Sequence, residues 1–306
     1  MKTSPSLMAI FFIWLCSIAL SPAASAEDDY QLTFERPAAV GQVYTFGSHG
    51  YVNLQMIQNL NNQPVAEETQ LIEAQMRGTI RITQVDEKGE ATALVLTPTD
   101  YAGRVDGEVV RINLNRALTI EAVEGELVVK DADGRPVLPE VVQVLDVLLS
   151  FVLETDTKEK TDDQIYKLGE LRRPGQAWEC DHELIAEGLS ESGQFTIEPG
   201  QIESEMRFVE VGQVFGEDAA NLELDIEVSG FAVPGLVEQG FEMKQSTGLV
   251  QIRGMLPINP ESTSGNVSKL IDFAVTAMLN LPDGQGVAEL QLVMQRQTQA
   301  EYELQD

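Results

Sequence analysis

The strongest constraint in this sequence is an alternation of apolar and polar residues with a period of two. Residues 287–297 read VAELQLVMQRQ, in which apolar and polar side chains take turns apart from Val293. Successive side chains of a β-strand point to opposite faces of its sheet, so this pattern predicts a strand with one buried and one exposed face. The apolar positions of the predicted buried face are Ala288, Leu290, Leu292 and Met294.

An upstream segment with the same alternation predicts a partner for this strand. Residues 270–280 read LIDFAVTAMLN and place Ile271, Phe273 and Val275 in phase, and the turn sequence PDGQG follows at 282–286. The two runs predict an antiparallel hairpin, with a helix over the first run as the alternative. Similar runs separated by Gly- and Asp-rich turns recur between residues 78 and 130. The predicted fold class is therefore mainly β: an antiparallel curved sheet or half-barrel.

One segment breaks the alternation. Residues 138–154 read LPEVVQVLDVLLSFVLE, with proline at a helix-starting position and a single narrow polar stripe formed by Gln143, Asp146 and Ser150. This pattern predicts an apolar helix over about 139–153, which at roughly 22 Å is too short to span a bilayer. We expect the helix to be buried under the concave face of the sheet. A buried pair of strands is the alternative.

The N-terminus has the features of a secretory signal peptide. Lys2 precedes an apolar run over residues 7–20 and a small-residue site that ends at Ala26, after which we predict cleavage. The apolar run is short for a membrane anchor, and Leu15 stands before Cys16 where a lipoprotein attachment site requires a small residue. We therefore expect an exported protein, periplasmic or extracellular, with no integral membrane segment in its mature chain.

Charge and cysteine content limit the partners and the means of stabilisation. The chain has 49 acidic and 20 basic residues, a formal net charge of −29. Such a surface repels phosphates, so nucleic acid and anionic membrane surfaces are not expected as partners. Cleavage of the signal peptide leaves Cys180 as the only cysteine, so no intrachain disulfide can form and the fold must rest on packing.

A polar, charged segment at 154–164 (ETDTKEKTDDQ) divides the mature chain. It predicts a first β unit with the helix over 27–153, a charged linker over 154–170 and a second β unit over 171–306. One continuous domain over 27–306 is the alternative.

The two predicted units share short stretches of sequence. LIEAQMR at 71–77 resembles QIESEMR at 201–207, and VGQVYTF at 40–46 resembles PGQAWEC at 174–180. These matches predict two tandem β repeats. Short alternating strands also resemble one another without common origin, so both explanations stay open.

Residues 178–184 read WECDHEL and gather several chemically reactive side chains. If the segment is a strand, Trp178, Cys180, His182 and Leu184 share one face. Cys180 and His182 are then roughly 6 to 7 Å apart, and the flanking acids raise a thiol pKa rather than lower it. A zinc site requires three or four ligands, and only His49 could join them. We therefore predict a core strand and no metal site.

Two further motifs fail as active sites or ion sites. His49 lies in FGSHGY, which lacks the G-x-S-x-G elbow of a serine nucleophile. An EF-hand frame that ends at Glu140 begins at Val129, which is not acidic, and contains Pro136. We predict a hairpin turn there, no catalytic residue and no cofactor, so the chain is not expected to be an enzyme.

The expected architecture resembles the exported bacterial half-barrels of the Lol type, which carry lipids or lipoproteins across the envelope. It is also similar to uncharacterised secreted bacterial proteins built from two β repeats. The resemblance implies a non-enzymatic carrier of an apolar ligand, with a helix that moves aside. The alternative is a structural or protein-interaction module of the envelope whose helix completes the core. For the carrier, the predicted lining is Val141, Leu145, Leu148, Val152, Phe273, Leu290, Leu292 and Met294.

Overall fold

The computed structural model describes residues 28–305, except 35, 37, 124–125, 151, 154–160, 192 and 283–285. The predicted signal peptide (1–26) and the first part of the predicted linker (154–160) therefore lie outside the described residues.

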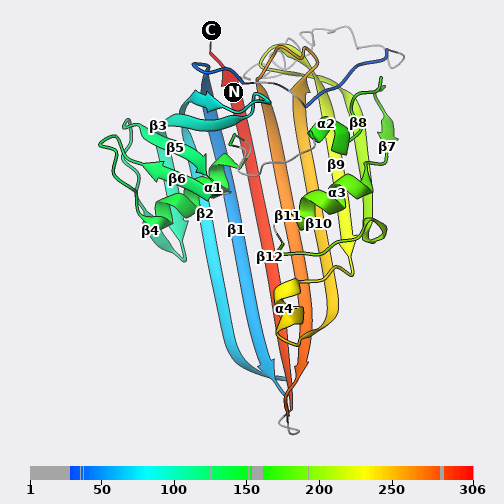
Figure 1. The fold of residues 1–306 in the computed structure, drawn as a ribbon. Coiled ribbons are helices and arrows are strands. Elements are labelled where there is room, and N and C mark those ends of the chain that lie inside the picture. The colour runs from blue at the N-terminus through cyan, green and yellow to red at the C-terminus, as the bar shows by residue number, and fades with distance from the viewer. Residues whose placement is uncertain are drawn as a thin grey trace, which may run out of the picture.

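Twelve strands form one open antiparallel sheet, which confirms the predicted fold class (Figure 1). The order across the sheet is β6-β5-β3-β2-β1-β12-β11-β10-β9-β8-β7, and β4 pairs with β3 alone. The first half of the sheet contains β1 (Val43–Leu60), β2 (Gln63–Val85), β3 (Ala91–Val105), β4 (Glu108–Val110), β5 (Leu118–Val123) and β6 (Glu126–Lys130). The second half contains β7 (Gln176–Trp178), β8 (Ile202–Val214), β9 (Glu217–Ser229), β10 (Glu242–Pro257), β11 (Gly265–Asn280) and β12 (Val287–Leu304).

The two halves meet where the first long strand pairs with the last. β1 and β12 are antiparallel neighbours from Tyr44 opposite Leu304 to Leu60 opposite Ala288. Strands from both predicted β units thus belong to a single sheet.

The predicted hairpin of residues 271–297 is confirmed as β11 and β12, with Phe273 opposite Met294. The alternation also divides the two faces as predicted. Phe273 is buried, whereas Val293, which points to the opposite face of β12, is 38% exposed. One face of the sheet is therefore apolar, and the helices lie on that face (Figure 1).

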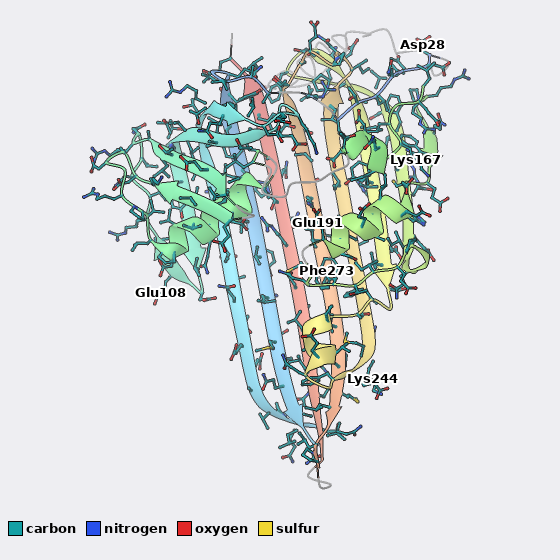
Figure 2. All side chains as sticks on the ribbon, in the orientation of Figure 1. Asp28, Glu108, Lys167, Glu191, Lys244 and Phe273 are labelled. Atoms are coloured by element: carbon teal, nitrogen blue, oxygen red, sulfur yellow. The ribbon has the colours of Figure 1, made fainter. Side chains whose placement is uncertain are left out.

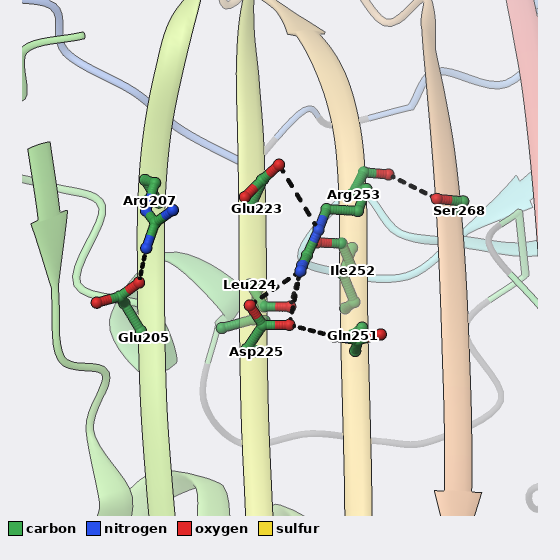
Figure 3. Close-up of polar contacts among 9 residues, drawn as sticks. All are labelled: Glu205, Arg207, Glu223, Leu224, Asp225, Gln251, Ile252, Arg253 and Ser268. Carbon is green, nitrogen blue, oxygen red and sulfur yellow. Dashed lines mark hydrogen bonds and ion pairs between the residues drawn. The ribbon is translucent and has the colours of Figure 1, made fainter. Parts of the chain in front are cut away.

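The opposite face of the sheet is polar and carries networks of charged side chains (Figure 3). Arg253 on β10 contacts both carboxylate oxygens of Asp225 on β9, at 2.7 and 2.9 Å, and lies 3.8 Å from Glu223. These side chains are about one-third exposed, so we expect each pair to contribute no more than about 1 kcal/mol. The charged side chains favour exposure of this face to water, so apolar contacts are expected on the helix-bearing face.

The buried side chains form two hydrophobic cores, one in each half of the sheet. The first core lies between β1, β2, β3 and the helix α1 (Pro139–Leu149), whose apolar residues are almost completely buried. The second core lies between β8, β9, β10 and the helices α2 (Asp162–Ile165) and α3 (His182–Ser190). A short 3₁₀ helix, η1 (Pro199–Gln201), leads into β8, and α4 (Pro234–Glu238) contacts β10.

The helix predicted over 139–153 is confirmed, and the alternative of two strands is wrong. The helix starts at Pro139 as expected but ends at Leu149, and the Val152 N–H then bonds to the Leu149 carbonyl in a turn. Leu153 is nevertheless buried in the first core. None of the helices among the described residues is long and apolar enough to cross a membrane.

Specific contacts fix α1 against the centre of the sheet. The Thr298 hydroxyl donates to the Val147 carbonyl at 3.2 Å, and Arg296 Nη2 donates to the Asp146 carbonyl at 2.8 Å. A Cβ atom on Gly50 of β1 would lie 2.4 Å from Val147 Cγ1, so only glycine permits this close approach. α1 therefore contacts strands of both halves.

The prediction of a core strand over 178–184 is wrong. β7 ends at Trp178, and α3 begins at His182. Asp181 is the N-cap, and its carboxylate accepts a hydrogen bond from the Leu184 N–H at 3.1 Å. This bond satisfies a backbone donor that has no partner inside the helix, and Glu183 adds a negative charge to the first turn. The capping signal, rather than the alternation, sets the local structure.

The strand pairing does not support the match of 40–46 to 174–180, which places Tyr44 on Trp178. Tyr44 lies opposite Ile80, whereas Trp178 lies opposite Met206. Ile80 and Met206 are not equivalent under the 130-residue offset that relates 71–77 to 201–207. An internal duplication stays a prediction.

We predict that Leu145→Ala will lower the free energy of unfolding by about 2–5 kcal/mol, because Leu145 is fully buried in the first core. The measurement is urea denaturation followed by circular dichroism. Leu138→Ala is the control, since Leu138 is 70% exposed at the start of the same helix and should change stability by no more than about 0.5 kcal/mol. Equal losses in the two variants would contradict the role of α1 as core.

Candidate functional site

A cavity of about 640 Å³ lies on the helix-bearing face of the sheet. Its walls come from both halves of the molecule: β2 and the end of α1 on one side, and β8, β9, β10 and the start of α2 on the other. The lining residues include Tyr44, Ile80, Ile82, Val152, Leu153, Met206, Leu222, Leu224, Ile252, Leu256, Val267 and Tyr302. The cavity therefore borders the two cores and has mainly apolar walls.

The N-terminal segment of the described chain closes one side of the cavity. Tyr30 and Arg172 exchange backbone hydrogen bonds at 2.8 Å, and Leu32 is buried in the second core. Further along, the Ala38 N–H donates to the Gly89 carbonyl in the loop between β2 and β3. The segment thus runs from the second half to the first across the upper end of the sheet, where Figure 1 shows it in dark blue. Phe34, Arg36 and Ala38 contribute to the cavity wall.

Arg36 is anchored by backbone oxygens. Its Nη1 donates to the carbonyls of Asn259, at 2.8 Å, and Ser262, and its Nη2 donates to the carbonyl of Pro257. Burial lowers the pKa of the guanidinium, while Tyr302, Asp163 and Glu217 act in the opposite direction. The positive charge of Arg36 is therefore fixed in place beside the cavity.

Two tyrosines lie on the strands that join the halves. The Tyr44 hydroxyl donates to Thr263 Oγ1 at 2.9 Å, and its ring packs edge-on against Tyr302 with 6.5 Å between centroids. Burial raises the pKa of Tyr302, so its phenol stays neutral at physiological pH. These rings give the cavity a rigid, partly polar wall at the seam of the sheet.

Of the eight residues predicted to line a ligand site, Val152 alone lines this cavity. Val141, Leu145 and Leu148 are buried within the first core. Leu292 and Met294 pack against the second core, and Leu290 is buried on β12. The structure therefore does not bring the eight residues together, and their role in ligand binding stays a prediction.

Phe273, which was also predicted to line the site, lies in an aromatic cluster of the second core. Its ring stacks on Phe195 with centroids 5.3 Å apart and meets Phe231 edge-on at 5.9 Å. Figure 2 labels it near the middle of the sheet. The alternation identified the correct face of β11 but not which of its positions border an open volume.

The cluster around Cys180 is a structural contact between α3 and β8. The Ser204 hydroxyl accepts a hydrogen bond from the Cys180 N–H at 3.1 Å and lies 3.0 Å from His182 Nε2. Glu179 approaches the same Nε2 at 3.4 Å, so the three side chains lack the base–orienter arrangement of a catalytic triad. Ser204 was not among the residues predicted from the sequence, because it is distant in the chain from Cys180 and lies in no recognisable motif.

The Cys180 thiol is buried and protonated. Cys180 is 2% exposed, and burial raises its thiol pKa from 9.0 to about 11. A protonated thiol is a poor nucleophile. Cys180 therefore serves as a small hydrophobic residue of the second core.

The remaining motifs lie away from the cavity. His49 is exposed on β1, opposite Gln75 and Gln299. The turn at 131–135 is the predicted hairpin turn, since Asp131 Oδ1 accepts hydrogen bonds from the N–H groups of Asp133 and Arg135. In the described part of the chain, no group of three or more His, Cys, Asp or Glu side chains could hold a metal ion.

No protein-family model matches the chain, and no curated protein matches it. Among solved structures, the chain is similar to an outer membrane channel from Pseudomonas putida F1, with 9% sequence identity and a TM-score of 0.19. The alignment covers 89% of this chain and 98% of that one. A similarity this low carries no argument about function, and the resemblance to Lol-type carriers stays a prediction.

We predict that Cys180 stabilises the fold in a pH-dependent way. The folded state holds the thiol proton more tightly than the unfolded state, because its pKa is about 11 instead of 9.0. The stabilisation is therefore complete below pH 9 and is lost as the pH rises through 11. Urea denaturation of the wild type and Cys180→Ala at several pH values measures the difference in their free energies of unfolding. This difference should shrink between about pH 9 and 11.

The thiol itself provides an independent check. A thiol reagent at pH 8 should modify Cys180 slowly in the native protein and rapidly in urea. Rapid modification of the native protein, or a constant difference between wild type and Cys180→Ala across this pH range, would contradict a buried, protonated thiol.

Proposed function

We propose that this chain is a non-enzymatic exported protein that binds an apolar ligand, such as a lipid or lipid-linked group, on the concave face of its sheet. The observation that supports this proposal is the cavity between the two cores. Its volume of about 640 Å³ falls in the range of about 300–1,000 Å³ typical of sites for small ligands. Its walls combine apolar strand residues with a few fixed polar groups, as such sites commonly do.

The polarity of the two faces supports the same proposal. Charged networks cover the opposite face of the sheet, as around Arg253 and Asp225 (Figure 3). An apolar ligand would therefore gain contacts on the helix-bearing face and none on the polar one.

The second candidate is an envelope structural or protein-interaction module without a small ligand. The degree of burial of α1 favours this alternative, because Val144, Leu145 and Leu148 complete the first core rather than cover an open space. Under this hypothesis the cavity is a packing defect between two cores that holds water only. Measurements of ligand binding separate the two candidates.

We predict that Ile252→Trp will weaken binding of an apolar fluorescent probe, 1-N-phenylnaphthylamine, because the larger ring fills the cavity that Ile252 lines. We expect an increase in Kd on the order of tenfold or more, about 1.4 kcal/mol. Fluorescence titration of the purified protein, prepared without detergent, measures the affinity.

Val293→Trp is the matched control, since Val293 lies on β12, separated from β10 by β11, and on the opposite, polar face. This variant should bind the probe with a Kd within about twofold of the wild-type value. Thermal unfolding by circular dichroism establishes that both variants are folded. Equal binding by both folded variants, or no binding by the wild type, would refute ligand binding in this cavity.

A further inference from the structure

The described residues that line the cavity carry a net charge opposite in sign to that of the chain. Arg36, Lys88 and Lys269 line it, together with Glu90 and Asp162. At neutral pH these residues carry three positive and two negative charges, whereas the whole chain has 49 acidic and 20 basic residues. A chain of this composition would be expected to line a cavity with an excess of acids. Among the described lining residues, cations therefore outnumber acids, in contrast to the chain as a whole.

Arg36 is the cation whose surroundings bear most directly on the ligand. Its hydrogen bonds go to three backbone carbonyls, which are neutral, and it forms no ion pair with a described carboxylate. Its Nε–H is buried and has no partner among the described residues. A cation removed from water is stabilised by a nearby negative charge, and neutral carbonyls supply only part of that stabilisation. The wall of the cavity thus contains a fixed positive charge that none of the described carboxylates contacts by a hydrogen bond or ion pair, although Asp163 and Glu217 act on it from farther away.

The apolar part of the cavity begins beside this charge. Tyr302 lies close enough to Arg36 for the guanidinium to lower the pKa of its phenol, against the larger effect of burial. From there the apolar wall continues with the partly exposed side chains of Val267, Ile252 and Leu256, behind which the isoleucines and leucines of the two cores are buried. A charged end and an apolar body thus share one volume of about 640 Å³.

We propose that the ligand is a single-chain amphiphile with an anionic oxygen head, a carboxylate or a phosphate. Its head would lie on the Arg36 side of the cavity, and its tail would lie among the isoleucines and leucines. The inference rests on the proposed function, since it specifies the ligand of the same cavity. Lys88 and Lys269 have interactions with other groups. As lining residues they also add positive electrostatic potential that favours the anionic head. The acidic outer surface repels anionic membranes, so the preference concerns single molecules that enter the cavity.

The test compares amphiphiles that differ in their head alone. Dodecanoate, dodecyl phosphate, dodecanol and dodecyltrimethylammonium are titrated, below their micelle concentrations and at pH 8, against wild-type protein loaded with 1-N-phenylnaphthylamine. We expect the two anions to displace the probe at concentrations on the order of tenfold lower than dodecanol does. The cation should be the weakest competitor. The ratio of dodecanoate to dodecyl phosphate distinguishes a carboxylate ligand from a phosphate ligand.

The outcomes separate this inference from the proposed function. If dodecanol competes as well as the anions or better, the head-group preference is wrong and the apolar site stands. If neither the probe nor any amphiphile binds, both proposals fail.

Variants of the lining cations test which residues cause the preference for anionic head groups. Arg36→Gln retains hydrogen-bond donors for the carbonyls but removes the positive charge. In this variant the anions should displace the probe at concentrations less than about threefold lower than dodecanol does. The affinity for dodecanol should be unchanged. Lys269→Met, on β11, serves as a second variant if Arg36→Gln does not fold, and it should reduce the ratio between dodecanol and anion concentrations in the same direction. Lys244→Met is the control, because Lys244 lies near α4, away from the cavity (Figure 2), and pairs with Glu242. A full anion preference in folded Arg36→Gln and Lys269→Met would overturn the inference.

Discussion

The pairing of β1 with β12 holds the two halves of the sheet together. These strands lie at opposite ends of the described chain, yet they are antiparallel neighbours from Tyr44–Leu304 to Leu60–Ala288. Closing so long a loop costs conformational entropy, which the continuous ladder and the contacts around it must offset. β12 also supplies Arg296 and Thr298 to the backbone of α1. The same strand therefore joins the two halves of the sheet and fixes the helix of the first core.

The cavity is a consequence of joining two separately packed halves. Each half buries its own core, the first with α1 and the second with α2 and α3. Between them, the seam strands contribute Tyr44 and Tyr302, and the N-terminal segment crosses from one half to the other. The space is apolar because both halves turn the apolar face of the sheet toward it. It also has a cationic element because Arg36 of the crossing segment is held there by carbonyls of the 257–262 loop. The position of the cavity thus follows from the packing of the two halves, whereas its positive charge comes from the N-terminal segment.

Patterns within one element predicted local structure well, and patterns between elements did not. The alternation over 271–297 gave the β11–β12 hairpin, and the almost wholly apolar 139–149 segment gave α1. At 178–184 the alternation was misleading, because Asp181 caps a helix and one hydrogen bond to Leu184 outweighs the pattern. The cavity could not be predicted from the sequence. Ile252 has the same alternation as Leu224, its buried partner on β9, and only the placement of the crossing segment and the helix ends determines which of such residues border open space.

The amount of ligand bound to the native protein tests most directly whether the cavity holds an anionic amphiphile. The protein is purified without detergent, denatured, extracted with organic solvent and analysed by quantitative mass spectrometry, with Ile252→Trp purified in parallel. We expect roughly one amphiphile with an anionic head per wild-type chain, as for a single cavity of this size, and a large reduction in the variant. Wild-type protein that releases no more amphiphile than the variant would show that the cavity holds no ligand.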